Sequence, residues 1–89
     1  VLDVRSPQEW ESGHIPGAEH HFLADMRDRI TGLDKAKRYA VYCASGYRAS
    51  IGASLMQARG FQNVRNVPGS WSAWTALGYD VEISEEATV

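Results

Sequence analysis

The sequence predicts one small α/β domain with a mostly parallel sheet. Strand-like and helix-like segments alternate along the chain without an internal repeat or a linker, and this alternation favours parallel strands joined by helical crossovers. Residues 39–42 form an apolar run with nothing to alternate against, as expected of a central strand buried on both faces. The length of 89 residues fits one compact domain.

The first predicted elements are a strand over residues 1–4 and a short helix after it. Ser6 can cap this helix, Pro7 suits its first position, and Glu9 can reach back to complete a capping box. The helix is expected to stop near Gly13, where the pattern gives way to turn residues.

Three shorter segments are expected before the buried run. Pro16 and Gly17 make residues 14–18 a rigid turn, because proline fixes φ and glycine frees it. A short strand over residues 19–22 and a weakly helical stretch over residues 23–30 follow.

A longer helix is predicted over residues 49–59. Ile51, Leu55 and Ala58 fall on one face of this helix, and we expect that face to be the buried one.

The remaining elements are a helix stop, a strand and a final helix. Gly60 is expected to end the long helix, with Phe61 packing back on Met56. A short strand over residues 64–67 and a helix over residues 70–77 complete the alternation.

The composition narrows the function classes. Nine basic and eleven acidic residues in mixed order give a formal net charge of −2, which argues against a general binder of nucleic acid or of membrane surfaces. The single cysteine, Cys43, excludes an internal disulfide and a cysteine-rich zinc site, and it suits a reducing compartment. With neither an apolar run of membrane-spanning length nor a signal peptide, we expect a cytoplasmic domain over residues 1–83 and a solvated acidic tail over residues 84–89.

Cys43 stands where the buried strand ends and a helix is about to begin. The small loop between them contains Gly46, so its backbone N–H groups can turn inward, and the helix N-terminus adds partial positive charge. Both effects stabilise a thiolate or a bound anion, so the pKa of Cys43 should lie below its ordinary value. Arg48 adds a permanent positive charge that could pair with an anionic substrate or brace the loop to a carboxylate. A lone cysteine is more often a small buried hydrophobe, but the combination of strand, cysteine, glycine loop, arginine and helix favours a site.

Four segments of the chain resemble the rhodanese family. Residues 43–50, Cys-Ala-Ser-Gly-Tyr-Arg-Ala-Ser, resemble the active-site loop of that family, and residues 13–18 and 2–5 match two further signatures. The turn at residues 68–71, with Trp74 after it, resembles a fourth. The four segments lie in the family's order and cover almost the whole chain.

The resemblance implies a five-stranded parallel sheet with helices on both faces, whose first strand and helix would precede Val1. It also implies persulfide chemistry at Cys43. Ser70 departs from the family pattern, in which a second glycine is common. The loop is similar to that of rhodanese domains fused to metallo-β-lactamase-like persulfide dioxygenases, so such a fused domain is an expected partner. The expected persulfide cradle is the following set of backbone N–H groups: Ala44, Ser45, Gly46, Tyr47 and Arg48.

The leading hypothesis for the function is a sulfurtransferase. The Cys43 thiolate would take the outer sulfur of thiosulfate or of a low-molecular-weight persulfide and pass it to cyanide, sulfite or a thiol, with no metal or organic cofactor. A cysteine-based phosphatase or arsenate reductase is the alternative enzyme, but its loop has five residues between cysteine and arginine, and four separate Cys43 from Arg48 here. A non-catalytic binding module is a third possibility, which the retained Cys43 counts against.

Several further residues have a functional and a structural interpretation. Asp3 and Arg5 lie near the carboxyl end of the first strand and could shape a pocket rim, although an ion pair that braces the fold is favoured. Trp71 could lie near the mouth of the pocket, Trp74 is expected in packing, and Tyr47 should point outward.

The three histidines give a weak metal signal. His14 is expected to form a hydrogen bond within its turn. His20 and His21 would point to opposite faces of a strand and could not easily share a metal ion.

Overall fold

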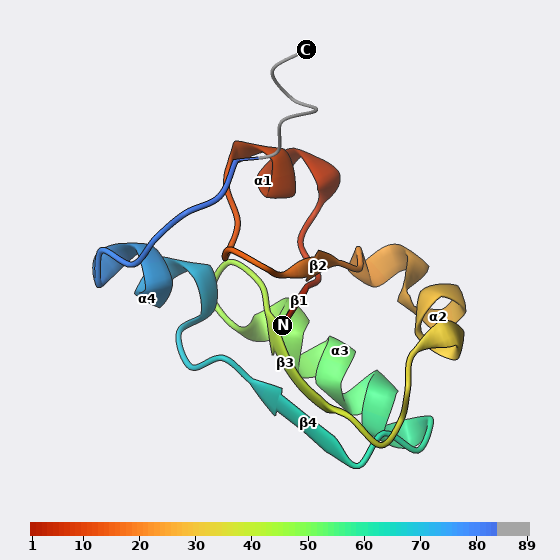
Figure 1. Ribbon diagram of the computed structural model, residues 1–89. Helices are drawn as coiled ribbons and strands as arrows, with labels where there is room; N and C mark the ends of the chain where they lie inside the picture. The colour runs from red at the N-terminus through yellow and green to blue at the C-terminus, as the bar shows by residue number, and fades with distance from the viewer. Residues whose placement is uncertain (84–89) are drawn as a thin grey trace.

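The computed structural model describes residues 1–83 as a four-stranded parallel sheet with helices around it (Figure 1). The strands lie in the order β2-β1-β3-β4. Their bounds are Leu2–Asp3 for β1, Glu19–His20 for β2, Arg38–Tyr42 for β3 and Asn63–Asn66 for β4. The family resemblance implies five strands, and residues 1–83 supply four of them, all parallel. The predicted acidic tail, residues 84–89, lies outside the described residues.

The strand registers place the functional loops at one edge of the sheet. Leu2 pairs with Glu19 of β2 on one side and with Val41 of β3 on the other. Val41 in turn pairs with Asn66 of β4. Because all pairs are parallel, the segments that follow the strands leave from the same edge, which is where α/β sheets place their sites.

Helices cover both faces of the sheet, as the resemblance implies. The helices are α1 (Pro7–Ser12), α2 (Met26–Arg29), α3 (Tyr47–Ala58) and α4 (Ser70–Ala76), and short 3-10 turns cover Leu23–Asp25 and Ile30–Gly32. On one face, Val4 and Val41 share a buried cluster with Met26 of α2 and Met56 of α3. On the other face, the ring of Tyr42 stacks against Trp71 of α4. No helix within residues 1–83 is long and apolar enough to cross a membrane.

The predicted buried face of α3 is wrong. Ile51 is 45% exposed, Ala58 is exposed, and Leu55 is only partly buried. The buried positions of the helix are instead the following: Ala49, Gly52, Ala53 and Met56.

Close packing explains this difference. A Cβ atom added at Gly52 would lie 3.3 Å from Sδ of Met26 and 3.5 Å from Cγ1 of Val4. Ala49, Gly52 and Ala53 therefore let α3 approach the sheet and α2, while Ile51 and Leu55 lie at its exterior and flank.

The end of α3 behaves as the sequence predicts, and the chain after α4 adds a contact that the sequence did not predict. Gly60 adopts φ +94° after α3, and the Phe61 N–H donates to the Met56 carbonyl at 3.1 Å. After α4 the chain returns to α1, where His14 and Glu82 form an isolated antiparallel bridge (Figure 1). The first contact directs the chain from α3 into β4 at the amino edge of the sheet, and the second holds the chain beside α1 without adding a strand to the sheet.

Candidate active site

Cys43 lies directly after β3, at the carboxyl edge of the parallel sheet and beneath the start of α3. Its side chain is only 1% exposed, and the Gly46 N–H donates to its Sγ at 3.0 Å. Gly46 adopts φ +115°, a conformation that residues with a Cβ rarely reach, and it caps α3. The helix begins at Tyr47, two positions before the predicted start, so its first free N–H groups belong to the loop.

The backbone around Sγ stabilises a thiolate. Burial raises the pKa of the Cys43 thiol, but the backbone N–H groups of Ala49, Gly46, Ser45 and Arg48 lower the pKa by more, and the result lies below the ordinary value. Ala49 was missing from the predicted cradle, although the free N–H groups of a helix's first turn are a general signal that points to it.

The two remaining residues of the predicted cradle, Ala44 and Tyr47, have contacts or orientations of their own. The Ala44 carbonyl anchors the loop to α4, because it accepts hydrogen bonds from the Ser72 N–H and Oγ, both at 2.9 Å. Tyr47 points outward, as predicted, with 77% of its surface exposed.

Ser70 fixes the backbone of Cys43 from the start of α4. Its Oγ accepts the Cys43 N–H at 3.2 Å and donates to the Val67 carbonyl at 3.3 Å. The Trp71 N–H then donates to the Cys43 carbonyl at 2.9 Å. Ser70 adopts φ +50°, so it takes the left-handed conformation that a glycine would take there, and its buried hydroxyl adds a hydrogen bond that glycine lacks.

Arg48 braces the loop to α1. Its Nη1 and Nη2 donate to Oε1 and Oε2 of Glu9 at 2.7 and 2.9 Å, in a bidentate pair whose side chains are each 34% exposed. The Arg48 guanidinium holds the pKa of Glu9 at about 2, and hydrogen bonds from Ser6 contribute to this. Of the two roles considered for Arg48, the structure places its guanidinium in the brace. The sequence offered no signal for this contact, because only the capping role of Glu9 is local.

Asp3 and Arg5 form the structural ion pair that the sequence favours over a pocket rim. Both are buried and form an ion pair, with Arg5 Nη2 at 2.8 Å from Asp3 Oδ2. Arg5 Nη2 also donates to the Gly13 carbonyl at 2.6 Å. The ring of Trp71 lies against this guanidinium, 4.5 Å from its Cζ, on the face of the sheet that carries Tyr42. These residues brace the carboxyl end of β1 beside the loop.

Each histidine has its own partners. His14 stacks on the ring of Trp10 at 3.4 Å, and its Nδ1 lies 3.0 Å from the Trp10 carbonyl, so it contacts α1 rather than its own turn. His20 Nε2 lies 2.7 Å from the Arg5 carbonyl, and His21 Nε2 lies 3.2 Å from Glu19 Oε2. Residues 1–83 contain no group of three side chains placed to hold a metal ion.

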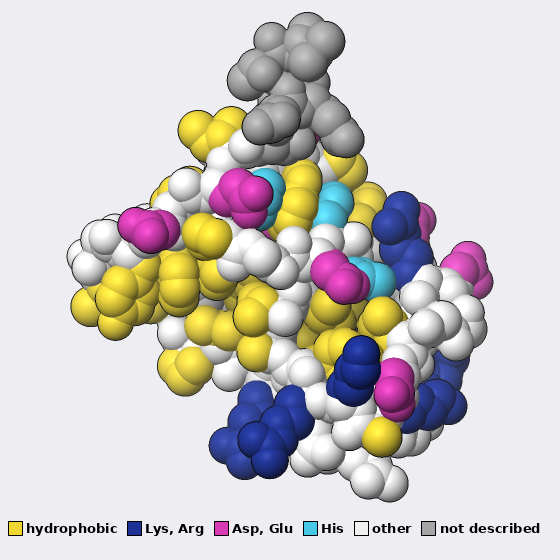
Figure 2. Space-filling model, in the orientation of Figure 1, with side chains coloured by type: hydrophobic (Ala, Val, Ile, Leu, Met, Phe, Trp, Pro, Cys, Tyr) yellow, Lys and Arg dark blue, Asp and Glu magenta, His cyan; other side chains and the backbone are white. Residues whose placement is uncertain are grey.

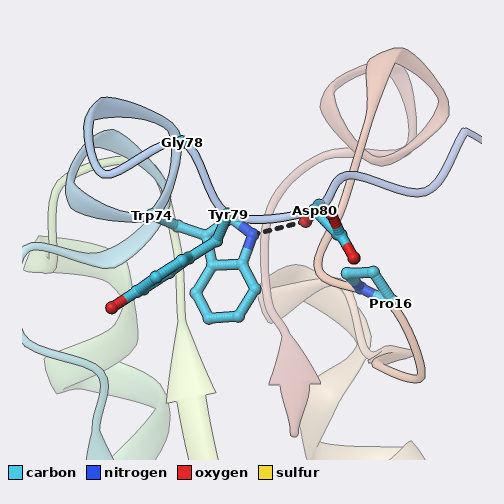
Figure 3. Close-up of a pocket in the computed structure, with 5 residues that line it drawn as sticks. All are labelled: Pro16, Trp74, Gly78, Tyr79 and Asp80. Atoms are coloured by element: carbon cyan, nitrogen blue, oxygen red, sulfur yellow. Dashed lines mark hydrogen bonds between the residues drawn. The ribbon is translucent and has the colours of Figure 1, made fainter.

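Trp74 packs outside the loop, in agreement with its expected role. Its ring contacts Tyr79 edge to face at 4.8 Å, and its Nε1 donates to the Asp80 carbonyl at 2.7 Å (Figure 3). With Pro16 and Gly78 these residues line a pocket of about 450 Å³ that contains no residue of the Cys43 loop.

A family model described as a rhodanese-like domain matches residues 1–77. The chain belongs to the rhodanese-like family. The match includes every residue of the Cys43 loop and both of its anchors, α1 and the start of α4.

Known proteins resemble this chain in sequence, and solved rhodanese-like structures resemble it in fold. The thiosulfate sulfurtransferase GlpE of Pseudomonas putida is 33% identical over 85 residues, which cover 96% of this chain and 76% of that protein. A Bacillus subtilis protein, YrkF, is 36% identical over 75 residues, and the match spans only 40% of that protein. The crystal structure of the rhodanese-like domain of the Anabaena sp. protein Alr3790 superposes with a TM-score of 0.86 at 34% identity, covering 92% of this chain and 95% of that one. The relatives thus include both near full-length matches and longer proteins of which the domain is a part.

Proposed function

We propose that this rhodanese-like domain is a sulfurtransferase that carries sulfane sulfur as a persulfide on Cys43. The observation that carries the proposal is the position of Cys43 Sγ at the base of a loop whose N–H groups lower the pKa of the thiol. Those same groups would stabilise the negative charge of a persulfide, which extends from the thiol position by one sulfur atom.

The reaction has two displacement steps. The Cys43 thiolate attacks the outer sulfur of thiosulfate, a new S–S bond forms, and sulfite leaves with the electron pair of the broken bond. A nucleophile then attacks the outer sulfur of the Cys43 persulfide and restores the thiolate. With cyanide the product is thiocyanate, and charge is conserved in both steps. A low-molecular-weight persulfide as donor, and sulfite or a thiol as acceptor, follow the same scheme. The chemistry requires no metal or organic cofactor.

The loop suits sulfur better than phosphate. Four residues lie between Cys43 and Arg48, so the amide ring is small, whereas a phosphoryl or arsenate group needs donors for three outer oxygens. Both Nη atoms of Arg48 that would bind such oxygens donate to Glu9 instead. These features favour a persulfide over a cysteine-bound phosphoryl group.

Intact mass spectrometry tests the proposal. The reduced domain should gain the mass of one sulfur atom on incubation with thiosulfate or an organic persulfide, and lose it when cyanide is added. A Cys43→Ser variant is the matched control and should gain nothing. Hydrolysis of an aryl phosphate without sulfur uptake would contradict the proposal, and a domain that neither gains sulfur nor hydrolyses phosphate would support the binding-module alternative.

The cellular context stays a prediction. A cytoplasmic location suits a single free thiol, and a fused metallo-β-lactamase-like domain is the expected partner.

A further inference from the structure

The positive charge of Arg48, in the loop that begins at Cys43, is balanced by an ion pair with Glu9. Arg48 is the one charged side chain in the loop over residues 43–49, and both of its terminal nitrogens donate to Glu9, at 2.7 and 2.9 Å. The loop therefore presents backbone N–H groups to a donor, but the charge of its cation is already neutralised.

Glu9 is held in this position from its own side as well. Its Oε1 accepts the Ser6 N–H at 3.1 Å, and its own N–H donates to Ser6 Oγ at 3.3 Å, so the carboxylate belongs to the capping box of α1. With a pKa of about 2, Glu9 stays charged at every pH at which a thiolate is useful. The neutralisation of Arg48 is thus permanent under working conditions.

Three further cations, Arg5, Arg38 and Arg65, are paired or lie along the strands away from the loop. Arg5 is buried against Asp3 and makes a second neutral pair. Arg38 opens β3 and Arg65 pairs with Ala40 of that strand; both line a separate pocket, and Figure 2 shows Lys and Arg side chains gathered over β4. Cys43 lies five positions after Arg38 and three after Ala40, paths of about 16 and 10 Å at the rise of a strand. These paths are as long as or longer than the Debye length of about 8–10 Å, so screening by salt weakens the attraction of either cation for a donor at Cys43.

We propose that Glu9 determines donor specificity by neutralising Arg48. The site then favours sulfane-sulfur donors with at most one negative charge near the transferred sulfur, such as thiosulfonates and organic persulfides, over the thiosulfate dianion. This inference rests on the proposed sulfurtransferase function. Backbone N–H groups supply the local stabilisation that any donor needs, while an unpaired guanidinium would add long-range attraction that grows with the donor's charge.

A matched pair of donors isolates the effect of charge. Methanethiosulfonate and thiosulfate both present a terminal sulfur bonded to an oxidised sulfur, but they carry one and two negative charges. In each case the Cys43 thiolate attacks the terminal sulfur and the S–S bond of the donor breaks. Methanesulfinate or sulfite leaves with the electron pair. Differences in intrinsic reactivity cancel when the ratio of the two kcat/KM values is compared between variants.

The experiment measures this ratio, with cyanide as acceptor, in three variants beside the wild type. Glu9→Gln keeps an amide oxygen that can accept from Arg48 and from the Ser6 N–H, but it frees one positive charge. In this variant we expect kcat/KM for thiosulfate to rise about tenfold relative to kcat/KM for methanethiosulfonate, mainly through a lower KM. The rise should become smaller as salt is added. Arg48→Gln leaves the Glu9 charge unbalanced, so the ratio should move in the opposite direction. Glu11→Gln removes an exposed charge from the same helix and should leave the ratio unchanged.

Each outcome shows whether Glu9 sets the preference between the two donors. Opposite shifts in the Glu9 and Arg48 variants, with an unchanged Glu11 control, support the inference. A constant ratio in both variants, or an equal shift in the control, overturns it. Because the two variants alter different elements, Arg48→Gln still gives the test if Glu9→Gln fails to fold. Absence of a sulfur mass gain on wild-type Cys43 from either donor would instead reject the proposed function itself.

Discussion

Substitutions at Ser70 distinguish two effects on the stability of the Cys43 loop: the strain of a left-handed backbone and the hydrogen bond to the Cys43 N–H. Ser70 holds φ +50° and its buried Oγ accepts the Cys43 N–H at 3.2 Å. A residue with a Cβ in the left-handed region costs about 1–2 kcal/mol relative to glycine, and a buried N–H left without a partner costs about 1–3 kcal/mol. Ser70→Ala keeps the strain and loses the bond, so it should lower the free energy of unfolding by about 1–3 kcal/mol. Ser70→Gly loses the bond but also relieves the strain, so it should be about 1 kcal/mol more stable than the alanine variant.

Thermal and urea unfolding measure these differences directly. For a domain of this size, 1 kcal/mol corresponds to a shift in Tm of about 4–8 °C. Ser72→Ala is a suitable control, because its Oγ also binds the loop, at the Ala44 carbonyl, but lies in an exposed position. Its loss should cost less than the loss at Ser70, since water can replace an exposed hydrogen-bond partner.

Two results would refute this reasoning about Ser70. An alanine variant as stable as the wild type would mean that the Cys43 N–H does not depend on the hydroxyl. A glycine variant less stable than the alanine variant would mean that the left-handed backbone is not strained at this position.

The thiol, the ion pair and the α3 face give three more predictions. Alkylation of Cys43 by iodoacetamide should stay fast to a lower pH than alkylation of free cysteine, because the pKa of its thiol is lowered, and it should slow as acid protonates the thiolate. The pKa of Glu9 is lowered in the folded domain, so the stability that its carboxylate contributes is complete above about pH 4.5 and is lost as the pH falls toward about 2. Urea unfolding of Glu9→Gln should therefore show a smaller loss of stability between pH 4.5 and pH 2 than the wild type. Met56→Ala should cost about 2–5 kcal/mol in urea unfolding because its side chain is buried in the core, whereas the exposed Ile51→Ala should stay within about 0.5 kcal/mol; equal losses would contradict the observed α3 face.

Elements with local signals could be predicted from the sequence. The Ser6–Glu9 capping box and the Gly60 stop with its Phe61 contact depend on residues within a few positions of each other, so the chain itself carries the information. The position of Cys43 between β3 and α3 was predictable for the same reason, because strand end, glycine loop and helix start are consecutive.

Features that depend on distant residues could not be predicted in this way. The pair between Glu9 and Arg48 joins positions 39 residues apart, and nothing near either residue indicates the other. The buried face of α3 was misjudged because the spacing of apolar residues does not show how closely a helix approaches its neighbours, and Gly52 lies where even a methyl group would contact Met26. Ser70 was recognised as a departure from the family pattern, but only the fold brings its hydroxyl to the Cys43 N–H, 27 residues away.

The anchoring of the Cys43 loop on two sides also bears on the entropy of the proposed sulfur transfer. Arg48 ties the end of the loop to α1, and Ser72 ties its beginning to α4. A loop already ordered before the sulfur arrives loses little conformational freedom when the persulfide forms, and it regains little when the sulfur departs. Each step then carries only a small ordering cost, so the free energy of the proposed transfer would depend mainly on the chemistry of donor and acceptor. A carrier of this kind can run in either direction, set by which sulfur compound is in excess.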